Sequence, residues 1–176
     1  MRFTETRLKG AYIIELDPSQ DERGFFAMSW SREEFSKRGL NDKLVECNVS
    51  FNAKKGTLRG MHYQLAPHAQ AKLVRCTMGA VYDVALDLRP ESPTRNKWTA
   101  VELTAENRRM FFIPEGFAHG FQTLADNAEV FYQMSEFYHP DAARGVRWND
   151  ATFGIEWPDD QRTISLRDRQ CPDFVF

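Results

Sequence analysis

Several signals that mark special classes of protein are missing from this 176-residue sequence. The three cysteines, Cys47, Cys76 and Cys171, are odd in number and form no CxxC pair, so they predict neither a disulfide framework nor a zinc site. No apolar run is long enough for a membrane span, and the N-terminal "MRFTETRLKG" lacks an apolar signal core. We therefore expect reduced thiols, a cytoplasmic location and no membrane partner.

An excess of positive charge is also missing. Lys and Arg together number 23 against 25 for Asp and Glu, which gives a formal charge of −2. Nucleic-acid binders depend on concentrated positive charge, so this balance predicts no nucleic-acid partner. A local basic pocket for one small anion remains compatible with it.

Strand signals dominate what is present. In "VYDVALDLR", Val84 and Leu86 face one way and Asp83, Ala85 and Asp87 the other, as in a strand with two distinct faces. Turn residues separate many such short segments, which predicts an all-β double-sheet jelly roll. The further predicted strands are "LVECNVS", "TLRGMHYQ", "KLVRCTM", "KWTAVELT", "RMFFIP", "HGFQTL" and "EVFYQMSEFY".

One short surface helix is predicted at residues 31–39, "SREEFSKRG", where Ser31 and Glu34 form a capping box and Gly39 can end the helix. After Tyr138 the chain is rich in Pro, Asp and Arg, so residues 139–176 are expected to form an irregular covering segment. We expect residues 1–176 to make a single domain.

The four histidines differ in context. His68 and His139 lie in polar, turn-like stretches and are expected at the surface. His62 and His119 lie at strand positions beside glycines, in "RGMHYQ" and "GFAHGF", and a jelly roll could bring them into one cavity.

A metal site is the first interpretation of such histidines. Metal-binding cupins usually place two histidines one residue apart on one strand and a carboxylate on the next. The chain resembles that layout but has Gln64 as the second residue and Lys72 where the carboxylate is expected. An ammonium has no lone pair and repels a cation, so no metal is predicted.

Proton transfer is the second interpretation. Histidine titrates near neutrality and is the commonest general base. Lys72 would stabilise the anion formed when a proton leaves carbon. Tyr132 and Tyr138 are candidate acids, and strand parity predicts that they share one face.

Motifs along nearly the whole chain resemble the dTDP-4-dehydrorhamnose 3,5-epimerase family. They run in the family's order and spacing: "DERGFF", "LRGMHYQ", "KLVRC", "SPT", "LTAEN", "IPEGFAHGF", "RGVRWND", "FGIEWP" and "ISLRD". The resemblance implies a jelly roll of the cupin type, usually a homodimer that exchanges an N-terminal strand. It also implies an isomerase that needs no cofactor.

The family's reaction implies catalytic roles. The C4 ketone of the sugar acidifies the protons on C3 and C5; a histidine removes such a proton and a tyrosine returns one to the opposite face. By motif, His62 matches the base, Tyr132 the acid and Asp168 the aspartate that orients the base. Lys72 matches the lysine beside the C4 oxygen, where enolate charge develops.

The implied substrate is a nucleoside-diphosphate sugar, dTDP-4-dehydro-6-deoxy-D-glucose in the first place. Arg23 and Arg59 match residues on the pyrophosphate, which suits guanidinium groups. Arg167 stands where the family often has lysine. The residues implied to bind substrate are Arg23, Phe26, Glu46, Cys47, Asn48, Arg59, His119, Tyr138 and Arg167.

Three positions depart from the family's usual residues. Met28 and Ala143 stand where glutamates are common, and Glu46 stands where glutamine is common. All three are implied to lie at the nucleotide or at the rim of the site. They leave open another nucleotide, such as CDP or GDP, and inversion at only one carbon.

The spacing of Arg59 and His62 poses a geometric question. They are three residues apart, so a regular strand points them to opposite faces. Both reach one ligand if Gly60 marks a bulge; alternatively, one reaches the ligand's far end around the barrel rim.

Other functions stay open at this point. A 3,4-ketoisomerase of the same fold needs no proton donor on the opposite face, so Tyr132 disfavours it. A metal-dependent cupin enzyme is disfavoured by Lys72. A protein that binds sugar nucleotides without catalysis is disfavoured by the retained acid and base.

Overall fold

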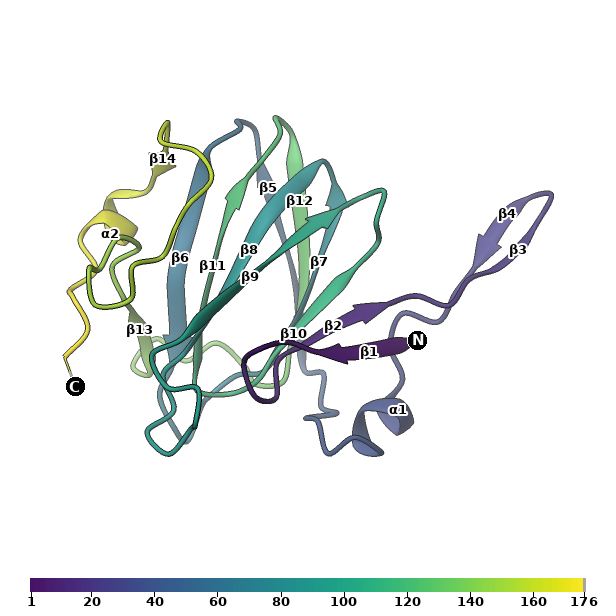
Figure 1. Cartoon of the computed structure of the whole chain (residues 1–176), viewed down its shortest axis with the longest axis horizontal. Coiled ribbons are helices and arrows are strands. Elements are labelled where there is room, and N and C mark those ends of the chain that lie inside the picture. Colours follow the sequence, from purple (N-terminus) through teal and green to yellow (C-terminus); the bar gives the residue numbers. More distant parts are fainter. Residues whose placement is uncertain (176) are drawn as a thin grey trace.

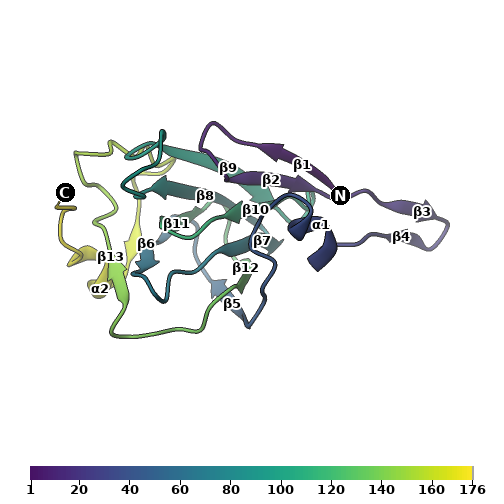
Figure 2. The same ribbon diagram turned by 90° about the horizontal axis from the view of Figure 1, so that it is seen from below.

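The computed structural model describes residues 1–175, which form two β-sheets and a projecting hairpin (Figure 1). The first sheet has the spatial order β1 (Arg2–Glu5), β2 (Tyr12–Glu15), β10 (Met110–Ile113), β7 (Lys72–Met78), β12 (Ala128–Met134) and β5 (Glu46–Asn52). The second has the order β13 (Ala143–Gly145), β6 (Thr57–Gln64), β11 (Phe117–Thr123), β8 (Ala80–Asp87) and β9 (Trp98–Thr104), with β14 (Thr163–Ile164) parallel to β6. Figure 2 shows the sheets as two facing layers, as the sequence predicts.

The space between the sheets holds one apolar core with residues from both layers. Its members include Val74, Phe111 and Val130 from the first sheet and Leu103, Phe117 and Phe121 from the second. Along β7 the side chains on the face of Val74 continue to Lys72, and along β12 those on the face of Val130 continue to Tyr132. Polar side chains therefore replace apolar ones toward one end of the interior, which opens a cavity there.

The second sheet is covered on both faces. Val84 and Leu86 share one face of β8, and they pack against Val146 and Phe153 of the C-terminal segment. Asp83 lies on the opposite face, toward the interior, and is fully buried. The predicted alternation is thus confirmed, and the segment after Tyr138 lies over the outer face of this sheet (Figure 1).

Two short helices are present where the sequence predicts one. In α1 (Arg32–Ser36) the Ser31 hydroxyl accepts a hydrogen bond from the Glu34 N–H, as expected of the capping box. The helix lies at the surface, but Phe35 is buried against Phe112. The second helix, α2 (Leu166–Arg169), spans four residues and is too short to leave a periodic signal. No helix among residues 1–175 is long and apolar enough to cross a membrane.

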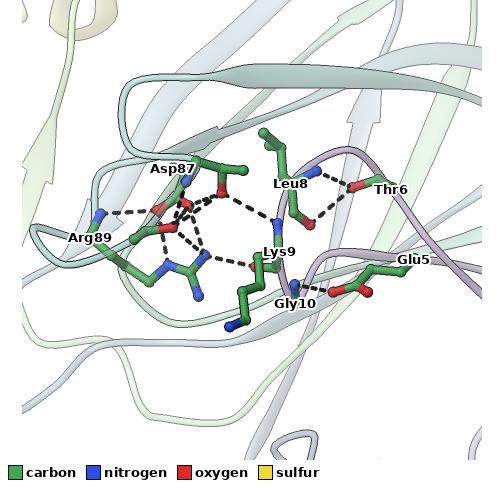
Figure 3. A network of polar contacts seen from close by, with 9 residues as sticks. Glu5, Thr6, Leu8, Lys9, Gly10, Asp87 and Arg89 are labelled. Atoms are coloured by element: carbon green, nitrogen blue, oxygen red, sulfur yellow. Dashed lines mark hydrogen bonds and ion pairs between the residues drawn. The ribbon is translucent and has the colours of Figure 1, made fainter.

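A buried carboxylate ties the β1–β2 turn to the end of β8 (Figure 3). Asp87 is fully buried and accepts hydrogen bonds from Arg89, Ser92 and Thr94. Arg89 also donates to the Lys9 carbonyl oxygen at 2.7 Å. Burial raises the pKa of Asp87, but these donors outweigh it and hold the pKa below its ordinary value.

A hairpin of β3 (Ser19–Asp21) and β4 (Gly24–Phe26) projects from the two sheets in both views (Figures 1 and 2). Its side chains are exposed, and Phe26 is 80% exposed. Arg23, at its tip, pairs with Asp21 of the same hairpin. The hairpin lies at the end of the molecule opposite α2 and the C-terminal segment.

Candidate active site

Two adjoining cavities open between the sheets. One has a volume of about 400 Å³ and the other about 260 Å³. They share His62, Lys72, Tyr132 and Arg167 in their walls. The space therefore forms one elongated site with a common centre.

An irregularity in β6 places Arg59 and His62 in the same site. His62 pairs with His119 and Arg59 pairs with Phe121, so Gly60 and Met61 together lie opposite a single residue of β11. The extra residue in β6 turns Arg59 to the side of His62. Gly60 has φ of +125°, and a Cβ there would lie 2.5 Å from the Gly120 Cα, so only glycine fits. Of the two arrangements that the sequence left open, a bulge at Gly60 or a reach around the barrel rim, the structure has the bulge.

His62 is held by a buried carboxylate. Its Nε2 lies 2.7 Å from Asp168 Oδ1, and the Asp168 side chain is only 6% exposed. Asp168 Oδ2 accepts the Gly60 N–H, and the Ser165 hydroxyl caps α2 by accepting the Asp168 N–H. Burial raises the pKa of Asp168, but the hydrogen bond with His62 and the other donors lower it below the ordinary value. A charged Asp168 fixes the His62 ring and leaves Nδ1 free to accept a proton.

Lys72 and His119 form a second polar group around Asp83. Burial lowers the pKa of the Lys72 ammonium to about 8, and the negative charge of Asp83 opposes this shift. Asp83 Oδ1 lies 2.5 Å from His119 Nε2. Its Oδ2 is buried without a hydrogen-bond partner among residues 1–175. Lys72 thus brings a buried positive charge to the wall of both cavities, where it can act on a developing anion.

Tyr132 faces His62 from the other sheet. It lies on β12, whereas His62 lies on β6, and both line each cavity. Burial raises the pKa of the Tyr132 hydroxyl, and the positive charge of Arg59 opposes the shift. Tyr132 therefore keeps its proton at neutral pH and is available as a donor. The Arg59 Nε donates to the buried Asn52 at 2.7 Å, which fixes the guanidinium in the smaller cavity.

The larger cavity extends to residues implied to hold the nucleotide. Glu46 and Asn48 line it from β5 and are joined by a 2.9 Å hydrogen bond. Tyr138 and Arg167 line it as well and interact with each other. The parity argument for Tyr138 is wrong, because β12 ends at Met134 and Tyr138 lies beyond it. Tyr138 nevertheless reaches the cavity from the following loop.

Three of the residues implied to bind substrate do not line the cavities of this chain. Cys47 points to the outer face of β5, since its neighbours Glu46 and Asn48 point inward. Arg23 and Phe26 lie on the projecting hairpin. Of the three departures from the family's residues, Glu46 and Ala143 line the larger cavity and Met28 does not.

Sequence reasoning missed Asp83, which pairs with His119, and several residues in the cavity walls. Asp83 was recognised only as part of the polar face of its strand, although an aspartate on an interior position is itself a signal of a buried partner. Tyr63, Gln70 and Arg144 carry no comparable signal, since polar strand and loop residues are common at the surface. All three line the larger cavity.

A jelly roll with a histidine on one sheet held by an aspartate of a short helix, a tyrosine on the facing sheet and a lysine in the same cavity has the features of a nucleotide-sugar epimerase. The chain belongs to the dTDP-4-dehydrorhamnose 3,5-epimerase family, whose sequence model matches residues 5–175.

Individual relatives agree with this assignment. The chain is 45% identical over 176 residues to the dTDP-4-dehydrorhamnose 3,5-epimerase of Shigella flexneri, covering 99% of this chain and 97% of that protein. The crystal structure of the enzyme from Elizabethkingia anophelis superimposes with a TM-score of 0.96 at 41% identity, over 99% of this chain and 96% of that one. The enzyme from Bacillus anthracis, solved with TDP and PPi bound, gives 0.94 at 40% identity, over 98% and 99%. The predicted jelly-roll fold is confirmed by these structures.

Proposed function

We propose that this protein is a dTDP-4-dehydrorhamnose 3,5-epimerase that inverts C3 and C5 of dTDP-4-dehydro-6-deoxy-D-glucose. The observation that carries the proposal is the placement of His62, with its aspartate, and Tyr132 on facing sheets of one cavity. Inversion requires that a proton leaves one face of the carbon and arrives at the other. Two proton-transfer groups on opposite walls meet this requirement.

The proposed chemistry begins with His62 Nδ1 taking the proton from C3 or C5. The electron pair of the broken C–H bond moves toward the C4 oxygen and forms an enolate, which the Lys72 ammonium stabilises. The enolate collapses to the ketone as Tyr132 transfers its hydroxyl proton to the opposite face of the carbon. His62 then returns its proton to solvent and the Tyr132 phenolate regains one, so the enzyme is restored without a cofactor.

The nucleotide is proposed to occupy the larger cavity, near Glu46, Asn48 and Tyr138, with the pyrophosphate near Arg59. TDP bound to the Bacillus anthracis relative supports this choice of nucleotide. Arg59 is positioned by Asn52 and lies at the smaller cavity with His119. Glu46 accepts hydrogen bonds from Asn48 and from the Tyr138 N–H, which gives it a structural task that a glutamine oxygen could share.

We further propose that the active form is a cytoplasmic homodimer. β5 lies at the edge of the first sheet and exposes Val49 and Phe51 on one face together with Cys47, and Val45, just before the strand, is exposed as well. A row of exposed apolar side chains on an edge strand favours burial against a second copy. The projecting hairpin would then deliver Arg23 and Phe26 to the partner's cavity. The three free cysteines suit a reducing compartment.

Solvent exchange tests the proposed reaction. In D₂O the wild-type protein is expected to place deuterium at C3 and C5 of the dTDP-sugar, and His62→Ala is expected to lose exchange at both. Product NMR separates inversion from carbonyl migration, so a 3,4-keto product would assign the protein to the ketoisomerases. Absence of exchange with dTDP-, CDP-, GDP- and UDP-sugars would leave only a binding role.

A further inference from the structure

Two histidines and a glutamate gather beside the larger cavity, away from the residues of the proposed reaction. His68 follows β6, whereas Glu136 and His139 follow β12. The possible ligand atoms of these three side chains all lie within 4.8 Å of one another. The two imidazole rings stack with centroids 3.6 Å apart, and His139 Nε2 lies 3.8 Å from Glu136 Oε1.

The backbone under this cluster is fixed by two glutamine side chains. Gln64 is 5% exposed; its amide donates to the carbonyl oxygens of His68 and Phe137, and its Oε1 accepts the His139 N–H. Gln70 donates to the carbonyl oxygen of Glu136 at 2.8 Å. The two chain segments that carry the ligands are therefore joined before any ion arrives, which reduces the conformational cost of binding.

We propose that His68, Glu136 and His139 form a binding site for a divalent transition metal, zinc in the first place. Two imidazoles and one carboxylate are the ligand set of many zinc sites with an open fourth position. Around a tetrahedral zinc, with bonds of about 2.0–2.1 Å, neighbouring ligand atoms lie about 3.3 Å apart. Rotation of the side chains has to bring ligand atoms that lie up to 4.8 Å apart closer by about 1.5 Å, and all three side chains are partly exposed. Calcium and magnesium are disfavoured, because both prefer oxygen ligands.

The site would act on the active-site rim without taking part in the reaction. Tyr138 lies between two of the ligands in sequence, and Tyr138, Gln64 and Gln70 all line the larger cavity. A metal bound to residues 136 and 139 would hold this loop, and with it Tyr138, in one position. The proposal does not depend on the epimerase function.

Calorimetric titration of the chelator-treated protein with zinc chloride tests the site. We expect one zinc per chain, and we expect His68→Ala and His139→Ala each to weaken binding more than about tenfold. Zinc should raise the Tm of the wild type, since it binds the folded state, and the same zinc concentration should raise the Tm of His68→Ala less. Cobalt bound in place of zinc should give visible d–d absorption that Glu136→Gln alters.

Matched variants separate this site from other metal-binding groups. His62→Asn and Cys47→Ser remove a histidine and an exposed thiol elsewhere, and both should bind zinc as tightly as the wild type does. Glu136→Gln preserves side-chain volume, so weaker binding in that variant with an unchanged zinc-free Tm excludes misfolding as the cause. The proposal is overturned if the wild type binds no zinc, or if the double variant His68→Ala/His139→Ala binds it equally well.

Discussion

At the scale of single residues, Lys72 shows how the cavity tunes chemistry. Burial brings its pKa to about 8, with Asp83 acting in the opposite direction. The ammonium is therefore still mostly charged at neutral pH, but its pKa lies only about one unit above that pH. A lysine at the surface would keep its charge until about pH 10.

We predict a basic limb in the pH profile of kcat that belongs to Lys72. Above about pH 8 the ammonium loses its proton and its stabilisation of the enolate, so kcat should fall about tenfold by pH 9. In Lys72→Arg this limb should be absent, because a guanidinium keeps its proton throughout this range. The same limb in the arginine variant would assign the titration to another group.

We predict that Tyr132→Phe separates exchange from inversion. Without the hydroxyl no proton reaches the far face of the carbon, so inversion should fall by about 10²-fold or more. His62 can still remove and return a proton, and deuterium exchange should persist. NMR of the sugar product measures both. Tyr12→Phe, on β2 against Phe3, is the matched control and should retain both activities; full inversion by Tyr132→Phe would take the tyrosine out of the proposed mechanism.

The proposed catalytic set could be named from sequence because each member lies within a motif. The contacts that other residues of the site make with one another inside the fold could not be predicted from sequence. His119 and Asp83 are 36 residues apart, and only the pairing of β8 with β11 brings them together. His68 and His139 each have the local signature of a surface turn, and their contact depends on two separate loops meeting.

At the scale of secondary-structure elements, long alternating segments were predicted well, whereas most short strands were missed and only β10 among them was predicted. The predicted strand at residues 57–64 matches β6, and that at 72–78 matches β7. The strands β1 to β4 span three or four residues each, too few for alternation to stand out. The sequence pattern also cannot show which face of β8 turns toward the space between the sheets. The C-terminal segment buries the outer face of this strand, so both faces of β8 are covered.

We predict that Asp87→Asn destabilises the junction of the β1–β2 turn with β8 by about 3 kcal/mol, since it removes a buried charge from Arg89. The Tm should fall by roughly 6–12 °C in a thermal melt. In the wild type, the stabilisation from Asp87 is present above about pH 4, its ordinary pKa. Because the folded pKa is lower, this stabilisation is lost as the pH falls through that lower value.

The control for this prediction is Asp160→Asn, which removes a fully exposed carboxylate paired with Arg162. A surface ion pair contributes little, so its Tm should change by less than about 2 °C. Equal decreases in Tm in the two variants would show that Asp87 contributes no more to the stability of the fold than a surface charge does.

At the scale of the whole molecule, the projecting hairpin leaves each chain with an incomplete set of the proposed substrate contacts. The hairpin that carries Arg23 and Phe26 projects away from the two sheets (Figure 1), and neither residue lines the cavities that contain His62. In a dimer that places each hairpin in the partner's cavity, every active site would draw residues from both chains. This arrangement can be tested by measuring the activity of mixtures of two variants.

We predict that two variants with different defects complement each other. Arg23→Ala should raise KM about tenfold or more by loss of a charged contact, and His62→Ala should abolish turnover. When equal amounts are refolded together, each mixed dimer has one site with both residues intact. About one quarter of all sites should then work like wild type at low substrate. Activity no greater than the sum of the separate variants would place Arg23 and His62 of one chain in the same site.

The extra residue at Gly60 and Met61 in β6 carries a consequence for how this sequence can change over time. The side-chain pattern of a strand repeats every two residues, so deletion of one of these two residues would leave Arg59 and His62 two apart in a regular strand, still on one face. The proposed pyrophosphate contact and the proposed base would then keep a common side. A side chain at position 60 would instead meet the Gly120 Cα, so the loss of one residue from "LRGMH" should be tolerated better than the replacement of Gly60.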